Sequence, residues 1–215
     1  MLNCFFTRNN SFPNSQIFFL NFLAHLYLSR HDEKLMVGNF IADSIRGKNF
    51  LQFEEKIAEG IIMHREIDTF TDSHPVVSRS KNLLRKEFNH YSGVIVDVFY
   101  DYFLAKNFSK YSDEELLDFT KRAYKIFHQH FEILPERNKN ILKFMEANNW
   151  LLSYATTEGI DRALTGMSRR VKHESGMERA TFFLIEHEKE FESHFNEFFP
   201  QMILHLKEKM FLPEN

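Results

Sequence analysis

Apolar residues recur every three or four positions along most of this chain, which is the spacing of one face of an α-helix. The clearest example is the segment 112–131, "SDEELLDFTKRAYKIFHQHF". Its apolar face consists of Leu116, Phe119, Ala123, Ile126 and Phe127. Ser112 followed by Glu115 is a capping-box pattern, so we predict that a helix begins there.

Two later segments show the same period. Pro135 is predicted to occupy the first position of a helix, where its missing N–H costs nothing. The apolar residues of this helix are Ile141, Phe144 and Met145. Near the C-terminus a second stripe consists of Phe191, Phe195 and Phe198. Pro200 is predicted to end that helix, because proline lacks the N–H that would continue it.

Strict alternation of apolar and polar residues is missing, so we predict no β-sheet. Residues 1 to about 16 combine Asn, Ser and Pro without a sustained period, and we expect a loop there. The predicted fold is an all-α, single-domain bundle of eight to ten helices over residues 20–215.

Composition supports this fold and excludes some functions. The 25 Phe and only 7 Gly favour long regular segments, and a net charge of −3 disfavours a general nucleic-acid binder. Cys4 is the single cysteine and fits a reducing compartment without proving one. The run 17–28 is too short to span a bilayer, and a signal peptide there would lack a cleavage site. We therefore expect a cytoplasmic protein.

The stretch "HREIDTFTDSHP" places titratable groups at helical spacing. On a helix predicted over residues 51–72, the side chains of His64, Asp68 and Asp72 lie on successive turns of one face and could share a cation. Pro75 forces His74 out of the helical conformation, at the end of this ladder. The alternative is a solvated helix end with an ion pair between Arg65 and Asp68.

A second pair of acids lies in "YSGVIVDVFYDYFLA", which is apolar all round and therefore predicts a buried helix. Asp97 and Asp101 are four residues apart on one face of it. Two buried carboxylates lose hydration and repel each other, so they require a cation, donors or a shared proton. A metal site would satisfy them, and pairing with Arg or Lys from a neighbouring helix is the alternative.

Two further segments add potential ligands. "NFLAHLYLS" places His25 in an apolar helix, where a hydrogen-bonded core histidine is the alternative. "GNFIADSIRG" offers Asn39 and Asp43, for which helix capping before Gly47 is the alternative. If these segments converge in a bundle, the mixed His and carboxylate set suits Mn²⁺, Fe²⁺ or Zn²⁺. HExxH, G-x-S-x-G and P-loop motifs are missing, and a single E-x-x-H makes a di-iron bundle a weak alternative.

Five stretches in order resemble the motifs of the acyl carrier protein phosphodiesterases, a bacterial family regarded as distant kin of HD-domain phosphohydrolases. They are "NFLAHLYLS", "GNFIAD", "GIIMHREIDTFTDSHP", "GVIVDVFYD" and "LLSYATTEGIDRALTGMSRR". The resemblance implies an HD-like fold and hydrolysis of the phosphodiester between 4′-phosphopantetheine and a serine of holo-acyl carrier protein, with Mn²⁺ as metal. The metal ligands or near-ligands that it implies are His25, Asp43, His64, Asp68, Asp97 and Asp101.

Phosphodiester hydrolysis suggests roles for other residues. A metal would lower the pKa of its water and orient the phosphate. Asp72 could accept the proton of that water, and His74 could protonate the departing serine oxygen. Two guanidinium groups, Arg65 and Arg169, could neutralise phosphate charge, with surface ion pairs as the alternative.

The chain departs from the family at one position that bears on activity. Members usually have a histidine where this chain has Tyr102, so a possible ligand or acid is here a phenol. If that histidine is essential to the family, this protein is inactive or uses another group.

The start of the chain also differs from the family. Members tend to begin at a Met-Asn-Phe that corresponds to Leu20, Asn21 and Phe22. The resemblance therefore implies that residues 1–19 are an N-terminal extension or the result of a misplaced start.

An acidic carrier protein as partner requires a local basic face. Three basic runs are available: Arg79, Lys81, Arg85 and Lys86; Lys121, Arg122 and Lys125; Arg169, Arg170 and Lys172. Two alternatives remain open. One is an HD-type phosphohydrolase of a small nucleotide, which needs no docking face. The other is a non-catalytic helical protein that binds an acidic carrier protein and no tight metal.

Overall fold

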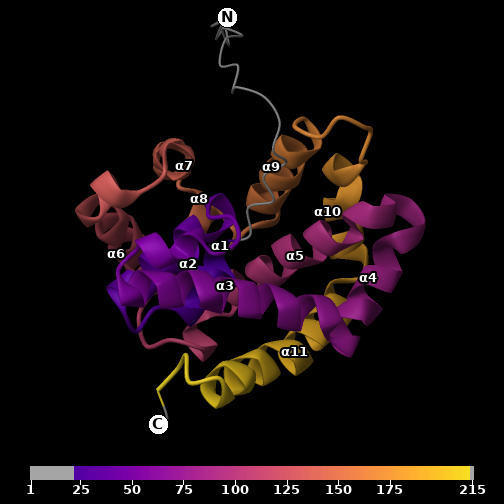
Figure 1. Cartoon of the computed structure of the whole chain (residues 1–215). Helices are drawn as coiled ribbons and strands as arrows, with labels where there is room; N and C mark the ends of the chain where they lie inside the picture. Colours follow the sequence, from indigo (N-terminus) through magenta and orange to yellow (C-terminus); the bar gives the residue numbers. More distant parts are fainter. Residues whose placement is uncertain (1–21, 214–215) are drawn as a thin grey trace, which may run out of the picture.

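The computed structural model describes residues 22–213, and this part of the chain contains eleven α-helices, several 3₁₀ turns and no β-strand (Figure 1). The helices are α1 (Phe22–Leu28), α2 (Glu33–Ile41), α3 (Glu55–Ser73), α4 (Pro75–Phe88), α5 (Ser92–Lys106), α6 (Leu116–Gln129), α7 (Glu136–Ala147), α8 (Trp150–Ser153), α9 (Thr157–Ser168), α10 (Ala180–Glu186) and α11 (Glu188–Glu208). The all-α prediction is confirmed, and the described residues form eleven α-helices where eight to ten were expected. The expectations for residues 1–19 and Cys4 lie outside the described residues. None of the described helices is both long and apolar enough to cross a membrane.

Helix α5 forms the centre of the bundle, as its apolar sequence predicts. It contacts α1, α4, α9 and α11, and most of its residues are buried (Figure 1). Its side chains Phe99 and Phe103 are fully covered, the first against Phe191 and the second against Phe195 of α11. Burial on every side explains why this helix shows no polar face.

Helices α2 and α3 approach each other unusually closely because each has a glycine at the contact. A Cβ atom on Gly38 would lie 2.0 Å from the Ile57 carbonyl oxygen, and one on Gly60 would lie 2.2 Å from that of Leu35. Hydrogen in place of a side chain lets the two backbones touch. This contact places the end of α2 beside the middle of α3, where most of the candidate ligands are found.

Three predicted helix starts need correction. The segment at residue 51 first forms a 3₁₀ turn, η2 (Asn49–Gln52), and α3 begins at Glu55, because Phe50 and Phe53 turn toward the core. The Ser112 hydroxyl accepts from Glu114 N at 3.1 Å, so it caps a turn and α6 begins later, at Leu116. Pro135 precedes α7 as its N-cap residue.

The predicted end at Pro200 is also wrong. This proline lies inside α11, which continues to Glu208. Pro200 is exposed, whereas Phe198, Phe199 and Met202 around it are buried. The apolar contacts on the inner side therefore hold the helix together across the missing backbone hydrogen bond.

Candidate metal and phosphate site

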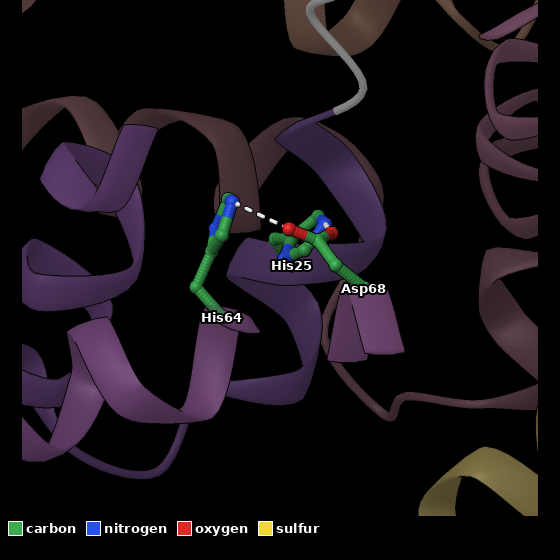
Figure 2. Close-up of side chains that lie close together, drawn as sticks. All are labelled: His25, His64 and Asp68. Atoms are coloured by element: carbon green, nitrogen blue, oxygen red, sulfur yellow. Dashed lines mark ion pairs between the residues drawn. The ribbon is translucent and has the colours of Figure 1, made fainter. Parts of the chain in front are cut away.

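Three candidate ligands, His25, His64 and Asp68, come together in the structure, and a fourth, Asp43, lies beside His64. His25 comes from α1, Asp43 from the 3₁₀ turn η1 (Ala42–Ser44), and His64 and Asp68 from adjacent turns of α3. The Nε2 atom of His25 lies 3.4 Å from Asp68 Oδ1, and His64 Nε2 lies 3.4 Å from both Asp43 Oδ1 and Asp68 Oδ2. Figure 2 shows His25, His64 and Asp68 gathered together, and ligand atoms of these three lie within 4.8 Å of one another.

These distances fit a shared cation better than a set of ion pairs. A charge-assisted hydrogen bond between nitrogen and carboxylate is about 2.7–2.9 Å long, which is shorter than the separations observed here. Two ligand atoms at about 2.0–2.2 Å from one metal are separated by about 3.0–3.5 Å. The ligand atoms of His25, His64 and Asp68 are therefore spaced as ligands of one divalent ion would be, and Asp43 lies next to them beside His64.

The protonation states of the cluster depend on its burial and on the charges of neighbouring side chains. Burial alone would raise the pKa of Asp43, but the neighbouring His64 imidazole outweighs this and lowers it. The pKa of Asp68 is lowered in the same way by His25. For His64 burial favours the neutral form, but Asp43 and Asp68 outweigh it and raise the pKa. Without a metal, the cluster thus favours two carboxylates and a proton on His64, because neighbouring carboxylates stabilise an imidazolium.

Behind the two histidines lies the amide of Asn39, which is completely buried near the end of α2. Its Oδ1 atom is 3.1 Å from His25 Nδ1 and 2.8 Å from His64 Nδ1. Its Nδ2 atom donates to the His25 carbonyl oxygen at 3.0 Å. One side chain thus holds both imidazoles from the side opposite the carboxylates. His25 is thus a hydrogen-bonded core histidine, as its sequence alternative stated, while the link from Asn39 to both histidines was not predicted.

The cluster lies on the wall of a pocket of about 480 Å³. The histidine and charged residues of the lining are His25, Asp43, His64, Asp68, Asp72, Asp97, Asp101 and Arg137. Helix α11 contributes much of the apolar lining, with Phe195, Phe198, Phe199 and Met202. A ligand in this pocket would contact charged groups on one side and aromatic rings on the other.

Asp97 and Asp101 line the same pocket but differ in their partners. Burial, with Asp68 nearby, raises the pKa of Asp97 to about 7. Burial also raises the pKa of Asp101 to about 7, although its oxygens accept from the backbone N–H groups of Leu23 at 3.0 Å and Ala24 at 2.8 Å. Asp101 therefore caps the first turn of α1 and holds in place the helix that carries His25, a role that neither the metal nor the ion-pair alternative anticipated.

The residues predicted for catalysis are more scattered. The Asp72 carboxylate lies at the edge of the pocket, is 80 % exposed and pairs with Lys81 at 2.8 Å. The other three predicted residues, Arg65, His74 and Arg169, are not among the described residues that line the pocket. His74 accepts from Val76 N at the start of α4, and Arg65 donates to the carbonyls of Ile45 and Gly47 instead of pairing with Asp68. Arg169 is exposed at the end of α9.

Sequence reasoning missed Arg137, the guanidinium that does line the pocket. It lies in the first turn of α7 and donates to the Asp43 carbonyl oxygen at 3.1 Å. Beside it, the buried Asn138 donates to Phe40 O at 2.8 Å, which anchors α7 against the end of α2. The segment "LPERNKN" has no motif that singles out this arginine, because its nearness to the cluster depends on how α7 packs.

Tyr102, the departure from the family pattern, points elsewhere. Its hydroxyl donates to Glu188 Oε1 at 2.8 Å, and it is not among the described residues that line the pocket. Asp101 is one residue earlier on α5, so its side chain points in a different direction and lines the pocket. The phenol thus contributes to the contact between α5 and α11.

Several residues of the first two basic runs are paired with acids. Arg79 contacts Glu197, Lys81 pairs with Asp72, and Arg122 forms a two-point contact with Glu114. Lys81 is the one nearest the pocket, since its partner Asp72 belongs to the lining. The other members of the α4 run, Arg85 and Lys86, are exposed in its last turn.

Comparison with known proteins agrees with these observations. The family model described as acyl carrier protein phosphodiesterase matches residues 20–202. Curated relatives with that name include proteins from Photorhabdus laumondii, 31 % identical over 89 % of this chain and 98 % of the relative, and from an Enterobacter species, 31 % identical over 88 % and 99 %. One from Escherichia coli O6:H1 is 31 % identical over 86 % and 96 %. No solved structure matches the chain significantly. Its sequence, over nearly the full length of these relatives, places the chain in the acyl carrier protein phosphodiesterase family.

Proposed function

We propose that this protein hydrolyses the phosphodiester that joins 4′-phosphopantetheine to a serine of holo-acyl carrier protein, with a divalent cation, Mn²⁺ by preference. The observation that carries the proposal is the convergence of His25, His64 and Asp68 in one pocket of a chain that belongs to this family. The pocket of about 480 Å³ has room for a phosphate and the neighbouring part of the prosthetic group.

The proposed metal ligands are His25, Asp43, His64 and Asp68, and their nitrogen and oxygen atoms match the preferences of Mn²⁺, Fe²⁺ and Zn²⁺. A cation bound there supplies Lewis acidity for the phosphate oxygens and lowers the pKa of a water. Asp101 is left out of this set because both of its oxygens accept backbone N–H groups.

The remaining polar groups of the pocket take roles that follow from their chemistry. Arg137 offers a guanidinium on the Asp43 side of the pocket and would bind the phosphate oxygens with paired donors. Asp72, at the edge of the pocket, would accept the proton of the attacking water. Asp97, whose pKa burial raises to about 7, would carry a proton in about half of the molecules at neutral pH and would donate it to the departing serine oxygen. We leave Arg65, His74 and Arg169 out of the chemistry.

Three finer points belong to the same proposal. Histidines and carboxylates contributed by separate helices of an all-α domain are compatible with kinship to HD-domain phosphohydrolases. The exposed residues of α4, Arg85 and Lys86, together with Lys81 near the pocket, would receive the acidic carrier protein. A carrier protein of fatty acid synthesis as substrate would place the reaction in the cytoplasm.

The test is mass spectrometry of holo-acyl carrier protein after incubation with the full chain and Mn²⁺. We expect loss of the phosphopantetheine mass, and we expect a chelator or the variant Asp68→Ala to prevent it. Asp118→Ala is the matched control, because this aspartate is exposed on α6 and pairs with Lys121. An unchanged mass with folded, metal-loaded protein would contradict the proposed substrate and favour a small phosphoester. An unchanged mass without metal binding would favour a non-catalytic partner of an acidic protein.

A further inference from the structure

The amide of Asn39 has a determined orientation. Its Nδ2 atom lies 3.0 Å from the His25 carbonyl oxygen, which can only accept a hydrogen bond. The amide nitrogen must therefore face that carbonyl, and the amide oxygen must face the two imidazoles. A flipped amide would place two oxygens against each other in a site with no exposed surface.

This orientation decides where each histidine carries its proton. The Oδ1 atom of Asn39 can only accept, so both ring nitrogens that face it, His25 Nδ1 and His64 Nδ1, must donate. A neutral imidazole carries one N–H, and a proton on Nδ1 leaves Nε2 with a free lone pair. In both histidines Nε2 is the atom that faces the carboxylates of Asp43 and Asp68.

We propose that Asn39 is a positioning residue that holds both His25 and His64 in the Nδ1–H tautomer and so presents two Nε2 lone pairs to one cation. Free neutral histidine in water mainly carries its proton on Nε2, so without Asn39 the rings would turn or exchange protons and lose a ligand atom. A single amide replaces the two separate partners that metal-binding histidines usually have. The tautomers follow from the hydrogen bonds of Asn39 alone. Their consequence for cation binding rests on the proposed function.

The experiment is ¹⁵N NMR of the histidine rings in the metal-free full chain at about pH 9, where imidazoles are neutral. Signals are assigned with His25→Asn and His64→Asn. We expect both Nε2 atoms to give the shift of an unprotonated nitrogen. In Asn39→Leu we expect Nε2–H signals to appear and the dissociation constants of Zn²⁺ and Mn²⁺, measured by calorimetry, to rise about 10–100-fold. Asn39→Ala, which removes the same acceptor with a smaller side chain, should also release Nε2–H signals and provides a second variant if the leucine variant does not fold.

The matched control is Asn107→Leu. Asn107 is also a buried asparagine, and its amide donates to Phe103 O and Glu192 at the end of α5, without a histidine partner. This variant should lose stability and keep both tautomers and metal affinity. Protonated Nε2 in the wild type, or unchanged tautomers in Asn39→Leu, would overturn the inference. Nδ1–H tautomers in a wild type that binds no cation would support the role of Asn39 in the tautomers and overturn the proposed function instead.

Discussion

The imidazole rings of His25 and His64 are stacked, with centroids 4.1 Å apart and planes inclined by 25°. Both side chains are buried, so two positive rings at this distance would repel each other with little solvent to screen them. The arrangement instead favours one cation shared by two neutral rings. A cation shared in this way requires that His25 of α1 lies beside His64 and Asp68 of α3, as observed.

Binding of Mn²⁺ should therefore stabilise the fold. At a concentration of about 100 times the dissociation constant, the free energy of unfolding should rise by about 2.7 kcal/mol. Thermal unfolding with and without metal measures this gain. Asp68→Asn should abolish it, while Asp118→Asn should keep it; an equal gain in both variants would place the cation elsewhere.

Metal affinity should increase with pH. The pKa of His64 is raised in the folded, metal-free protein, so its charged form contributes stability that is fully present below about pH 6.5 and is lost as pH rises through the raised value. A metal must displace that proton, and its apparent dissociation constant should fall by up to about tenfold per pH unit below the pKa of His64. Calorimetry in buffers of different ionisation enthalpy counts the protons released. Zero release at about pH 6, where His64 carries its proton, would contradict His64 as a ligand.

Removal of the Asp101 carboxylate should loosen α1. The variant Asp101→Ala leaves the N–H groups of Leu23 and Ala24 without their acceptor, at a cost of about 1–3 kcal/mol in the free energy of unfolding. Because α1 carries His25, metal affinity should fall as well. Denaturant unfolding and calorimetry measure the two effects.

Asp32→Ala is the control for this prediction. Asp32 accepts from Lys34 N and Leu35 N and caps α2 in the same way, but it does not line the pocket. It should lose stability without losing metal affinity. Equal metal affinity in both variants would show that Asp101 acts on stability alone.

The contact between α2 and α3 should tolerate no side chain at Gly60. In Gly60→Ala the new Cβ would meet the Leu35 carbonyl oxygen at 2.2 Å, so the helices must separate, at a cost of about 1–3 kcal/mol or more. Separation would also move Asn39 away from His64. Gly166→Ala in α9 is the control: nothing lies within 4 Å of its Cβ, and alanine there should stabilise the helix by about 0.5–1 kcal/mol. Denaturant unfolding of both variants measures the difference.

Arg137→Ala should weaken substrate binding and turnover if its guanidinium contacts the phosphate. We expect kcat/KM for holo-acyl carrier protein to fall by about 10–100-fold, equivalent to about 1.4–2.7 kcal/mol, with Mn²⁺ affinity retained. Arg137→Lys should recover only part of the loss, because an ammonium lacks the paired donors. Arg162→Ala, an exposed arginine of α9, should have no effect. Full activity of Arg137→Ala would remove this residue from the proposal.

The sequence by itself determined the helices and the local ligand ladder. The apolar period identified the inner face of α6, and the nearly continuous apolar sequence of α5 identified it as a buried helix. The four-residue spacing of His64 and Asp68 placed them on one side of α3, because such spacing depends on a single helix alone. Pro75 likewise predicted that His74 leaves the helical conformation.

Only the tertiary structure decided what each polar group contacts. Asp101 turned out to cap α1, Asn39 to bridge two histidines, and Arg137 to line the pocket. Each of these contacts joins different helices, and their relative placement depends on packing details such as the paired glycines Gly38 and Gly60. Spacing along one helix carries no information about such contacts, because the free energy that selects them is shared among many side chains of the whole bundle.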